Sequence, residues 1–382
     1  MQKLLIASGI YPPDIGGPAT YSQLIAREFI EQGINATIIC YGDKKEELGD
    51  KEEKFKIKRI LRKHNILVRY WLYFWNLFKL AKNVDIIYAQ GPVNSGFPAI
   101  LVAKILKKNI LLRLGGDYIW ERAIDKSEIN LTLRQYYQTG IFKKQGCIFK
   151  IFKWVIKSVD TVIFSTAFQR EIYLEYLGLN KEKTVVIGNA FPDFKEVSSP
   201  DIPHNNQILF AGRIAKLKNL SLLIRVFSEI ISTTNKDIQL GIIGDGDDLE
   251  KKRLSKLVKK LRLENRVFFE NRIPHQELLE RIKRCYFAVL PSLTDISPNF
   301  VLECIKLNKP ILCTKEIGFY KDFENNLVFF DPCDKEDLSK KIKWLLEEKN
   351  YNDYKERMKR IKIERSWPEL IKEHLLVFKN LK

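Results

Sequence analysis

The sequence contains few of the residues that build disulfide frameworks and metal centres. Its 382 residues include only six cysteines and four histidines. No two cysteines form a C-x-x-C pair, and the histidines lie far apart along the chain. The sequence therefore indicates neither a disulfide framework nor a zinc site.

Long apolar runs are also missing. The longest stretch without a charged residue, 86–103, contains glycines, prolines and amide side chains that would leave polar groups unsatisfied in lipid. The apolar run at 3–8 is too short for the apolar region of a signal peptide. We therefore expect no transmembrane helix and a protein that stays in the cytosol.

Acidic residues are outnumbered, which leaves a formal net charge of +18. Such a chain is attracted to phosphate-bearing surfaces, either nucleic acid or anionic lipid. Segments 54–82 and 141–157 interleave lysine and arginine with bulky aromatic residues, a combination typical of helices that lie at a membrane surface. The alternative is a core-facing amphipathic helix with a solvated basic face. We expect peripheral contact with an anionic membrane.

The length and the pattern of apolar residues predict two domains. A chain of 382 residues exceeds the size that one hydrophobic core usually serves. Short β-type runs alternate with helical patterns, which indicates parallel βαβ units. The expected strands occupy residues 4–8, 36–41, 85–89, 110–114, 161–164 and 184–187, then 208–211, 239–243, 266–269, 287–290, 310–313 and 327–330. We expect doubly wound α/β domains over 1–190 and 207–366, joined by a proline-rich linker over 191–206.

Ligands bind such sheets at the carboxyl ends of the strands, so the loops that follow the strands carry the candidate sites. After the first strand, Gly16 and Gly17 precede a helix expected near Ala19. Paired glycines at this place let backbone N–H groups approach a phosphate or a sugar. The alternative is a Gly-Gly turn that only ends one element and starts the next, which is more common.

The loop after the first strand of the second half carries Arg213 and Lys218, which are suited to hold the two phosphates of a nucleotide diphosphate. Alone, basic residues before a helix usually form a solvated face. The next strand ends in Gly244-Asp245-Gly246, which lacks the third glycine of a dinucleotide-binding fingerprint. This second motif carries little weight as a phosphate loop.

A fourth loop brings two carboxylates close to the start of a helix. Asp295 and Glu303 have no third ligand spaced to complete a metal site, so we expect them to accept hydrogen bonds from sugar hydroxyls. The alternative is an N-capping aspartate and a solvated glutamate in the first turn.

Taken together and in this order, the motifs resemble the GT-B glycosyltransferases, and within them glycosyltransferase family 4. The resemblance covers nearly the whole chain and includes Asn189-Ala190 before the linker and Ser366-Trp367-Pro368 near the end. It implies two Rossmann-like domains that face each other across a cleft, and a final helix, 367–382, that packs back on the first domain. It also implies a retaining enzyme that uses a nucleotide-diphosphate sugar and requires no metal or other cofactor.

The resemblance further implies a role for each motif. Arg213 and Lys218 would bind the pyrophosphate and stabilise the charge on the leaving phosphate. Glu303 would hold the ribose hydroxyls. Gly16 and Gly17 would border the donor phosphates. The transferred sugar would lie against Asp295 and the backbone of Ser297, Pro298, Asn299 and Phe300.

Two departures from the family pattern concern the sugar and the catalytic machinery. Asp295 stands where the family usually has glutamate, and its shorter side chain changes which hydroxyls it can reach. The loop 114–121 has no histidine where many members carry one, and Asp117 is the nearest candidate for contact with a substrate. A structural turn capped by Asp117 is the alternative.

The family mechanism is a front-face displacement in which no enzyme nucleophile is required and the leaving phosphate oxygen accepts the proton of the acceptor. The acceptor expected from the basic aromatic segments is a lipid-linked saccharide of surface polysaccharide assembly. Rival interpretations are a nucleotide-sugar epimerase or a phosphorylase of the same fold, and a basic nucleic-acid-binding protein. The last would present aromatic residues on a sheet face, whereas these lie in helix-like segments.

Overall fold

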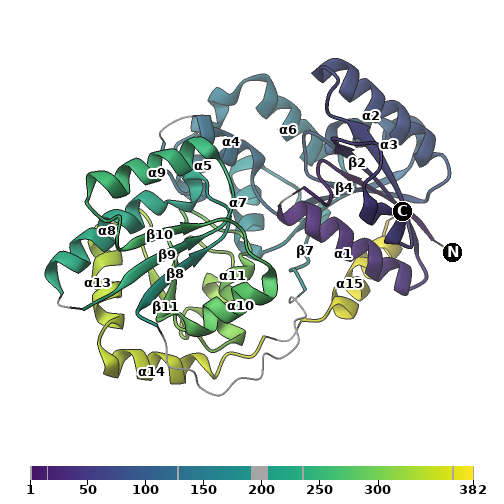
Figure 1. Cartoon of the computed structure of the whole chain (residues 1–382). Helices are drawn as coiled ribbons and strands as arrows, with labels where there is room; N and C mark the ends of the chain where they lie inside the picture. The colour runs from purple at the N-terminus through teal and green to yellow at the C-terminus, as the bar shows by residue number, and fades with distance from the viewer. Residues whose placement is uncertain are drawn as a thin grey trace. The chain divides into compact units, whose positions relative to one another are not determined.

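The computed structural model describes residues 2–14, 16–126, 129–190, 205–234, 236–363 and 365–381. The described chain divides into two compact units (Figure 1). The first unit holds the residues up to Trp120, Tyr137–Ala190 and 365–381. The second unit holds Glu121–Tyr136 and the described residues between 205 and 363.

The first unit is built on a seven-stranded sheet with the order β3-β2-β1-β4-β5-β6-β7, in which every described pairing is parallel. The strand order reverses between β1 and β4, which makes their carboxyl ends the topological switch point of this sheet. The strands are β1 (Lys3–Ser8), β2 (Asn35–Gly42), β3 (Lys56–Leu61), β4 (Ile86–Gln90), β5 (Asn109–Leu114), β6 (Thr161–Phe164) and β7 (Thr184–Val186).

The helices of the first unit cover opposite faces of this sheet. The chain moves one way along the sheet from β1 to β3 and the other way from β4 to β7, and right-handed crossovers then place the intervening helices on opposite faces. One face carries α1 (Gly17–Glu31), which packs against α15 (Trp367–Lys379). The other carries α2 (Ile66–Ala81), α3 (Gly96–Leu106), α6 (Cys147–Ser158) and α7 (Ala167–Leu177).

The strand β3 corrects the sequence interpretation of segment 54–82. That interpretation treated the whole segment as helix-like, because its basic and aromatic residues dominate the pattern. The structure divides it into β3 and α2. Lys56 and Lys58 are both exposed on β3, the edge strand of the sheet, where lysine protects against pairing with another chain.

The second unit contains a six-stranded sheet with the order β10-β9-β8-β11-β12-β13, again parallel in every described pairing. Its order reverses between β8 and β11, so the loops after these two strands flank the switch point. The strands are β8 (Gln207–Ala211), β9 (Gln239–Ile243), β10 (Val267–Glu270), β11 (Phe287–Leu290), β12 (Ile311–Thr314) and β13 (Val328–Phe330).

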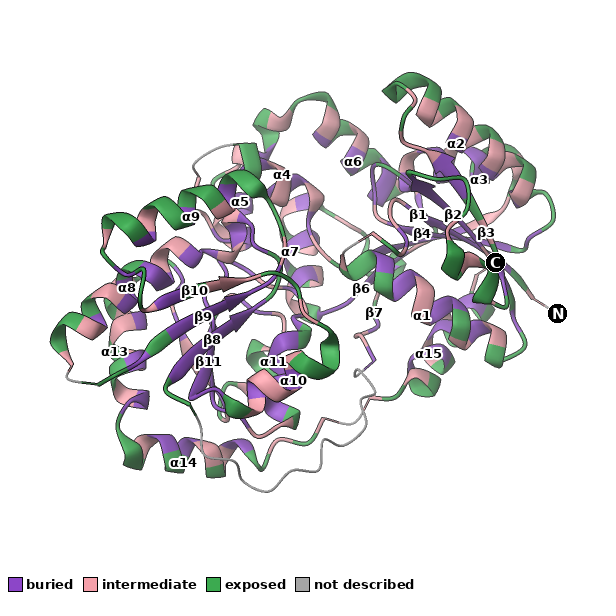
Figure 2. Cartoon of the chain, viewed as in Figure 1, coloured by how far each residue is buried: buried purple, intermediate pink, exposed green. Residues whose placement is uncertain are grey.

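Amphipathic helices cover this second sheet, and the central strands β8, β11 and β12 are buried between their apolar sides (Figure 2). The core consists of branched aliphatic and aromatic side chains from both layers, and it is separate from the core of the first unit. The helices are α8 (Leu220–Thr233), α9 (Asp248–Lys260), α10 (His275–Arg284), α11 (Asn299–Lys306), α12 (Tyr320–Phe323), α13 (Lys335–Leu345) and α14 (Glu348–Met358). The sheet order and the burial together give a doubly wound α/β unit.

The segment Glu121–Tyr136 groups with the second unit, although the sequence boundaries assign it to the first. It includes most of α4 (Tyr118–Lys126) and the start of α5 (Leu133–Gln138). The backbone N–H of Leu133 donates to the Thr294 hydroxyl at 2.8 Å, and the Lys216 ammonium donates to the Asp125 carbonyl at 3.0 Å. These two contacts join positions 91 and 161 residues apart, which an analysis of local sequence patterns does not detect.

Helix α15 is held on the first unit by a buried histidine. Nδ1 of His374 lies 2.8 Å from the Leu370 carbonyl oxygen. Because a carbonyl oxygen can only accept, Nδ1 carries the proton and donates this hydrogen bond. Nε2 therefore accepts from the Tyr88 hydroxyl at 2.9 Å and lies 3.4 Å from the Tyr21 hydroxyl. Burial lowers the pKa of His374 to about 3. The imidazole is thus neutral in the folded protein.

Acidification is expected to loosen this packing. Because the folded-state pKa of His374 lies below its ordinary value of 6.5, the unfolded chain binds a proton first as pH falls. Stability is therefore lost below the ordinary value, by about 2 kcal/mol between about pH 7 and about pH 5. Thermal denaturation at the two pH values measures this loss. The variant His374→Gln keeps a hydrogen-bond acceptor and cannot titrate, so its loss of stability between the two pH values should be smaller by that amount. An unchanged loss would contradict a buried, neutral His374.

Candidate active site at the switch point of the second sheet

The loops after β8 and β11 are tied together by an ion pair and by their backbones. The Lys218 ammonium donates to Oδ2 of Asp295, and both side chains are largely buried. The Ser292 hydroxyl donates to the same oxygen at 3.1 Å. The Leu293 N–H donates to the Leu217 carbonyl at 2.9 Å, which fixes one loop on the other. Two residues predicted to hold the donor thus lie in direct contact at the switch point.

The backbone of Asp295 is fixed from the opposite side as well. Its N–H donates to the Glu316 carbonyl at 2.9 Å, and its carbonyl accepts from the Gly318 N–H at 3.0 Å. Both partners follow β12, the next strand of the sheet. The Asp295 carboxylate is therefore held in place by three loops, which is the preorganisation that a binding group needs.

Arg213 extends from the loop after β8 and is half-exposed. One of its terminal nitrogens donates to the Glu121 carboxylate at 3.0 Å. An exposed ion pair of this kind contributes little to stability, so the guanidinium can exchange Glu121 for a phosphate at small cost. Arg213 is therefore accessible to an anionic ligand, and its phosphate-binding role stays a prediction.

The Gly244-Asp245-Gly246 motif brings two backbones into close contact. A Cβ atom on Gly244 would lie 1.9 Å from the Gly212 carbonyl oxygen, and one on Gly246 would lie 2.0 Å from the Ile214 carbonyl oxygen. The Ile214 N–H donates to the Asp245 carbonyl at 2.9 Å. The glycines therefore let the loop after β9 pack against the loop that carries Arg213, and this explains the motif without a phosphate.

Glu303, predicted to bind a ribose, lies in α11 with its carboxylate almost fully buried. Nε2 of His275, the first residue of α10, lies 2.9 Å from its Oε1. This hydrogen bond raises the pKa of His275 above its ordinary value, which favours the imidazolium form beside the carboxylate. A buried carboxylate with one oriented partner keeps acceptor sites for ligand hydroxyls.

The four residues 297–300, predicted to line the sugar site, surround the start of α11. Pro298 is the N-cap residue and Asn299 the first helical residue. The Phe300 side chain is buried, with its ring centroid 6.3 Å from that of Phe210 in the core. The Phe300 side chain thus belongs to the core, and the predicted ligand contact of this stretch is left to its backbone at a helix N-terminus and to its other side chains.

Gly16 and Gly17 open α1 in the first unit. Gly16 is the N-cap residue, with a φ of 154° that favours glycine, and its added Cβ would lie 3.0 Å from Cδ1 of Ile10. Gly17 has open space around its Cα. The helix begins at Gly17, two residues earlier than the sequence indicated. The backbone conformation therefore requires glycine at position 16, whereas position 17 has room for a side chain.

Asp117 has the structural role that was its alternative interpretation, and this arrangement gives no support to its predicted contact with a substrate. It caps α4, since its Oδ1 accepts from the Trp120 N–H at 2.7 Å. Its Oδ2 accepts from the hydroxyls of Tyr137 and Tyr173, each at 2.7 Å. Burial raises the pKa of this carboxyl, and the three hydrogen bonds oppose the shift only in part. A carboxylate so enclosed has no surface left for a ligand.

Sequence reasoning missed two residues that orient the site. His275 was set aside because the four histidines are far apart, yet it lies 28 residues before its partner Glu303. Its position at a helix start just after a strand was the available signal. Ser292 orients Asp295 from the same loop, and nothing in the sequence separates it from other serines. Among the described residues, no three His, Cys, Asp or Glu side chains are grouped so as to hold a metal ion.

Models of two protein families match successive parts of the chain. The model described as Glycosyltransferase Family 4 matches residues 15–193, and the model described as Glycosyl transferases group 1 matches residues 194–365. Together they account for both units. The chain belongs to glycosyltransferase family 4. Its two Rossmann-like units are those of the GT-B fold, as the sequence predicted.

Curated relatives of this family 4 chain are distant. An uncharacterised glycosyltransferase of Methanocaldococcus jannaschii is 26% identical over 47% of this chain and 45% of the relative. Mannosylfructose-phosphate synthase of Agrobacterium fabrum is 25% identical over 48% of this chain and 44% of the relative. The chain thus matches less than half the length of these two relatives.

Solved structures share the fold of this family 4 chain over its full length. The Anabaena protein HepE, in complex with UDP, has a TM-score of 0.73 at 16% identity and covers 100% of both chains. Sucrose-phosphate synthase from Thermosynechococcus elongatus also has a TM-score of 0.73 at 16% identity, covering 100% of this chain and 99% of the other. At this identity the likeness concerns the fold alone.

Proposed function

We propose that the protein is a glycosyltransferase that transfers a hexose-type sugar from a nucleotide-diphosphate sugar. The observation that carries the proposal is the convergence of Lys218, Asp295 and the accessible Arg213 on loops at the switch point between β8 and β11. Ligands of doubly wound sheets bind at such points. A solved structure of the same fold contains UDP, which supports a nucleotide donor.

In this proposal, Arg213 and Lys218 bind the donor pyrophosphate. Arg213 exchanges its exposed contact with Glu121 for a phosphate oxygen, and Lys218 approaches the second phosphate while Asp295 holds its position. As the bond to the sugar breaks, negative charge accumulates on the leaving phosphate and the two cations stabilise it. No divalent ion is then required for this task.

The transferred sugar lies against Asp295 and the backbone at the start of α11. A carboxylate accepts hydrogen bonds from sugar hydroxyls, and the first N–H groups of a helix donate to them. The reaction proceeds with retention, by front-face displacement, and the leaving phosphate oxygen takes the proton of the acceptor hydroxyl. Catalysis then depends on positioning and charge stabilisation.

The acceptor in this proposal is a glycan, in the simplest case a lipid-linked saccharide of surface polysaccharide assembly at the inner face of the cell membrane. The basis is the basic and aromatic surface of the first unit, which contains five exposed large apolar side chains on α2 alone. The described helices include none that is long and apolar enough to cross a membrane. An acceptor anchored in lipid would thus be met by peripheral contact.

Glu303 is expected to determine ribose recognition. In Glu303→Gln, the neutral amide is a weaker acceptor for the ribose hydroxyls, so nucleoside diphosphate affinity should fall by roughly 10- to 100-fold. The preference for the ribonucleotide over its 2′,3′-dideoxy analogue should shrink by a similar factor. Competition binding measures both. Glu250→Gln is the control, because Glu250 is also a buried glutamate near a helix start but pairs with Arg253. Equal effects of the two substitutions would refute the assignment.

The transferase proposal is tested by supplying common nucleotide-diphosphate sugars, in EDTA, together with a lipid extract as acceptor. The expected result is release of one nucleoside diphosphate and transfer of the sugar to a lipid fraction, with the anomeric configuration of the donor preserved in the NMR spectrum. Interconversion of donors without transfer would identify an epimerase instead. Inverted product would overturn the front-face mechanism, and a strict metal requirement would overturn the role given to Arg213 and Lys218.

A further inference from the structure

The helical parts of the two basic aromatic segments, α2 and α6, lie in one layer of helices in the first unit. Helix α3 packs against both α2 and α6, and all three cover the same face of the seven-stranded sheet (Figure 1). The two segments are separated by almost sixty residues of sequence. The fold therefore joins them into one surface, which we call the α2–α3–α6 surface.

Helix α2 presents apolar side chains to solvent on the side away from its buried residues. Leu67 is 80% exposed, Trp71 61% and Trp75 43%. Their spacing of four residues places them in one row along the helix. The rings of Trp71 and Trp75 stack at 6.5 Å, and the Lys79 ammonium lies 5.6 Å from the Trp75 ring centroid. The row is thus a preformed aromatic ridge with lysine at its end.

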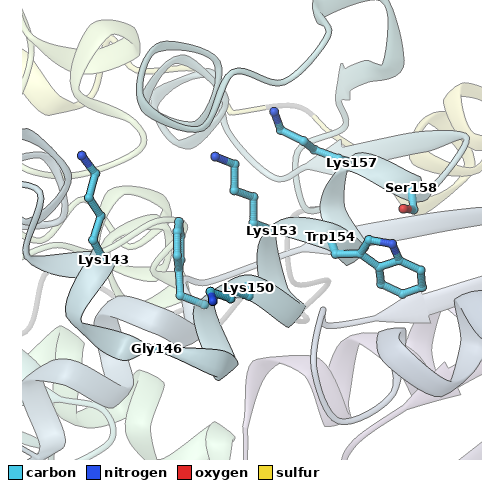
Figure 3. Close-up of a pocket in the computed structure, with 8 residues that line it drawn as sticks. Lys143, Gly146, Lys150, Lys153, Trp154, Lys157 and Ser158 are labelled. Carbon is cyan, nitrogen blue, oxygen red and sulfur yellow. The ribbon is translucent and has the colours of Figure 1, made fainter.

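Helix α6 and the turn before it line an open hollow of about 540 Å³ with lysine and aromatic side chains. Phe149 and Trp154 supply the apolar part, and the side chains of Lys143, Lys153 and Lys157 extend to one side of the ribbon (Figure 3). This combination fits a ligand that has both a negative group and an apolar portion.

Helix α3 connects the ridge to the hollow. The Lys104 ammonium lies 4.7 Å from the Trp154 ring centroid, and the Phe97 ring meets that ring edge to face at 6.0 Å. Ile105 of α3 is also well exposed. Apolar and cationic side chains therefore continue across all three helices.

The charge of this surface has one sign. Residues 66–84, 86–116 and 129–159, which contain the three helices, include no aspartate or glutamate, although the chain has 47 of them. Surfaces of soluble proteins usually intersperse charges of both signs. A surface without carboxylates and with exposed indoles is complementary to an anionic, partly apolar partner.

We propose that the α2–α3–α6 surface docks on an anionic phospholipid membrane. The exposed indoles of Trp71, Trp75 and Trp154 lie at the depth of the headgroups, where amphipathic rings are stabilised. Lysines of α3 and α6 meet the lipid phosphates, and Leu67 and Ile105 reach the acyl boundary. A nucleic-acid duplex would match the charge but would leave the exposed leucine and isoleucine without a partner.

Vesicle flotation of the full chain tests the proposal, with phosphatidylcholine vesicles that contain or lack phosphatidylglycerol. The chain should float with the anionic vesicles only. Lys150→Gln/Lys153→Gln should weaken binding about 25-fold, because each lysine near an anionic surface contributes about fivefold. Trp71→Ala/Trp75→Ala should weaken it by a similar factor or more, since two indoles lose their place at the interface.

The matched control is Lys252→Gln/Lys256→Gln, which removes two exposed lysines from α9 of the second unit, a helix with a comparable density of lysine. This control should bind anionic vesicles as the unmodified chain does. All variants should still bind nucleoside diphosphate, because the donor site lies in the other unit. Failure to float with anionic vesicles, equal flotation with neutral ones, an equal loss in the control, or preferential binding to a nucleic-acid duplex would each overturn the proposal.

Discussion

Replacing Lys218 by alanine is expected to lower kcat about 10²- to 10³-fold. In the proposed reaction, Lys218 stabilises charge that develops on the leaving phosphate, and loss of one such group typically has this effect. The substitution also leaves the largely buried Asp295 without its cation, so the sugar site loses an orienting contact. Steady-state kinetics with the identified donor, at saturating acceptor, measure the change.

Two further variants separate catalysis from folding. Lys216→Ala removes a lysine from the same loop whose ammonium binds the Asp125 carbonyl instead, and it should keep kcat within about threefold. Lys218→Ala/Asp295→Asn removes the unpaired carboxylate, so it should recover thermal stability and remain inactive. Full activity in Lys218→Ala would refute the role of this lysine, and so would an equal loss in Lys216→Ala.

Gly244→Ala is expected to destabilise the second unit by about 3 kcal/mol or more, or roughly 10 °C in its melting temperature. The φ of 149° at Gly244 is strained for any L side chain, and the added Cβ would lie 1.9 Å from the Gly212 carbonyl oxygen. Because backbone cannot rotate away as a side chain can, the two loops must separate. Arg213 then loses its position, so the affinity for a nucleotide should fall together with the melting temperature.

Gly49→Ala is the matched control for this glycine. A Cβ on Gly49 meets nothing within 4 Å, and this residue lies in an exposed helical turn of the first unit. The melting temperature of the Gly49→Ala variant should differ from that of the unmodified chain by less than about 2 °C. If Gly244→Ala melted as Gly49→Ala does, the close approach of the two loops would not be a feature of the folded protein.

Much of the fold could be predicted from the sequence because its strands are buried on both faces. Runs such as 208–211 and 287–290 are continuously apolar and bounded by glycine or proline, which is typical of parallel strands. The strand β3 could not be recognised in this way. It is an edge strand whose alternate residues are lysines, so its pattern merges with that of the basic helix that follows.

The candidate site was predictable where its chemistry follows a strand directly. Arg213, Lys218 and Asp295 were chosen as candidates because a loop after a parallel strand is the expected place for a ligand. The partners of these side chains were not predictable, since Glu121 lies 92 residues before Arg213 and Asp295 lies 77 residues after Lys218. Such pairs arise from tertiary packing, which no local pattern records.

Asp117 illustrates a pattern that has two structural meanings. A carboxylate between a strand and a helix has the same sequence pattern whether it binds a ligand or caps the helix. In the structure, two tyrosines that lie 20 and 56 residues further along the chain enclose the Asp117 carboxylate, as expected for a helix cap. The α2–α3–α6 surface was likewise beyond the sequence, because only the parallel order of the strands brings α2 and α6 to the two sides of α3.

Titration calorimetry of a nucleoside diphosphate into the full chain, in EDTA, tests the central claim most directly. The account predicts one binding site per chain, and a loss of affinity of at least about 100-fold in Arg213→Ala/Lys218→Ala, because two charge-assisted contacts with phosphate disappear. The double variant should remain folded by circular dichroism. No binding of any of UDP, GDP, ADP or dTDP, or binding that the double variant retains, would contradict a donor site at the switch point between β8 and β11.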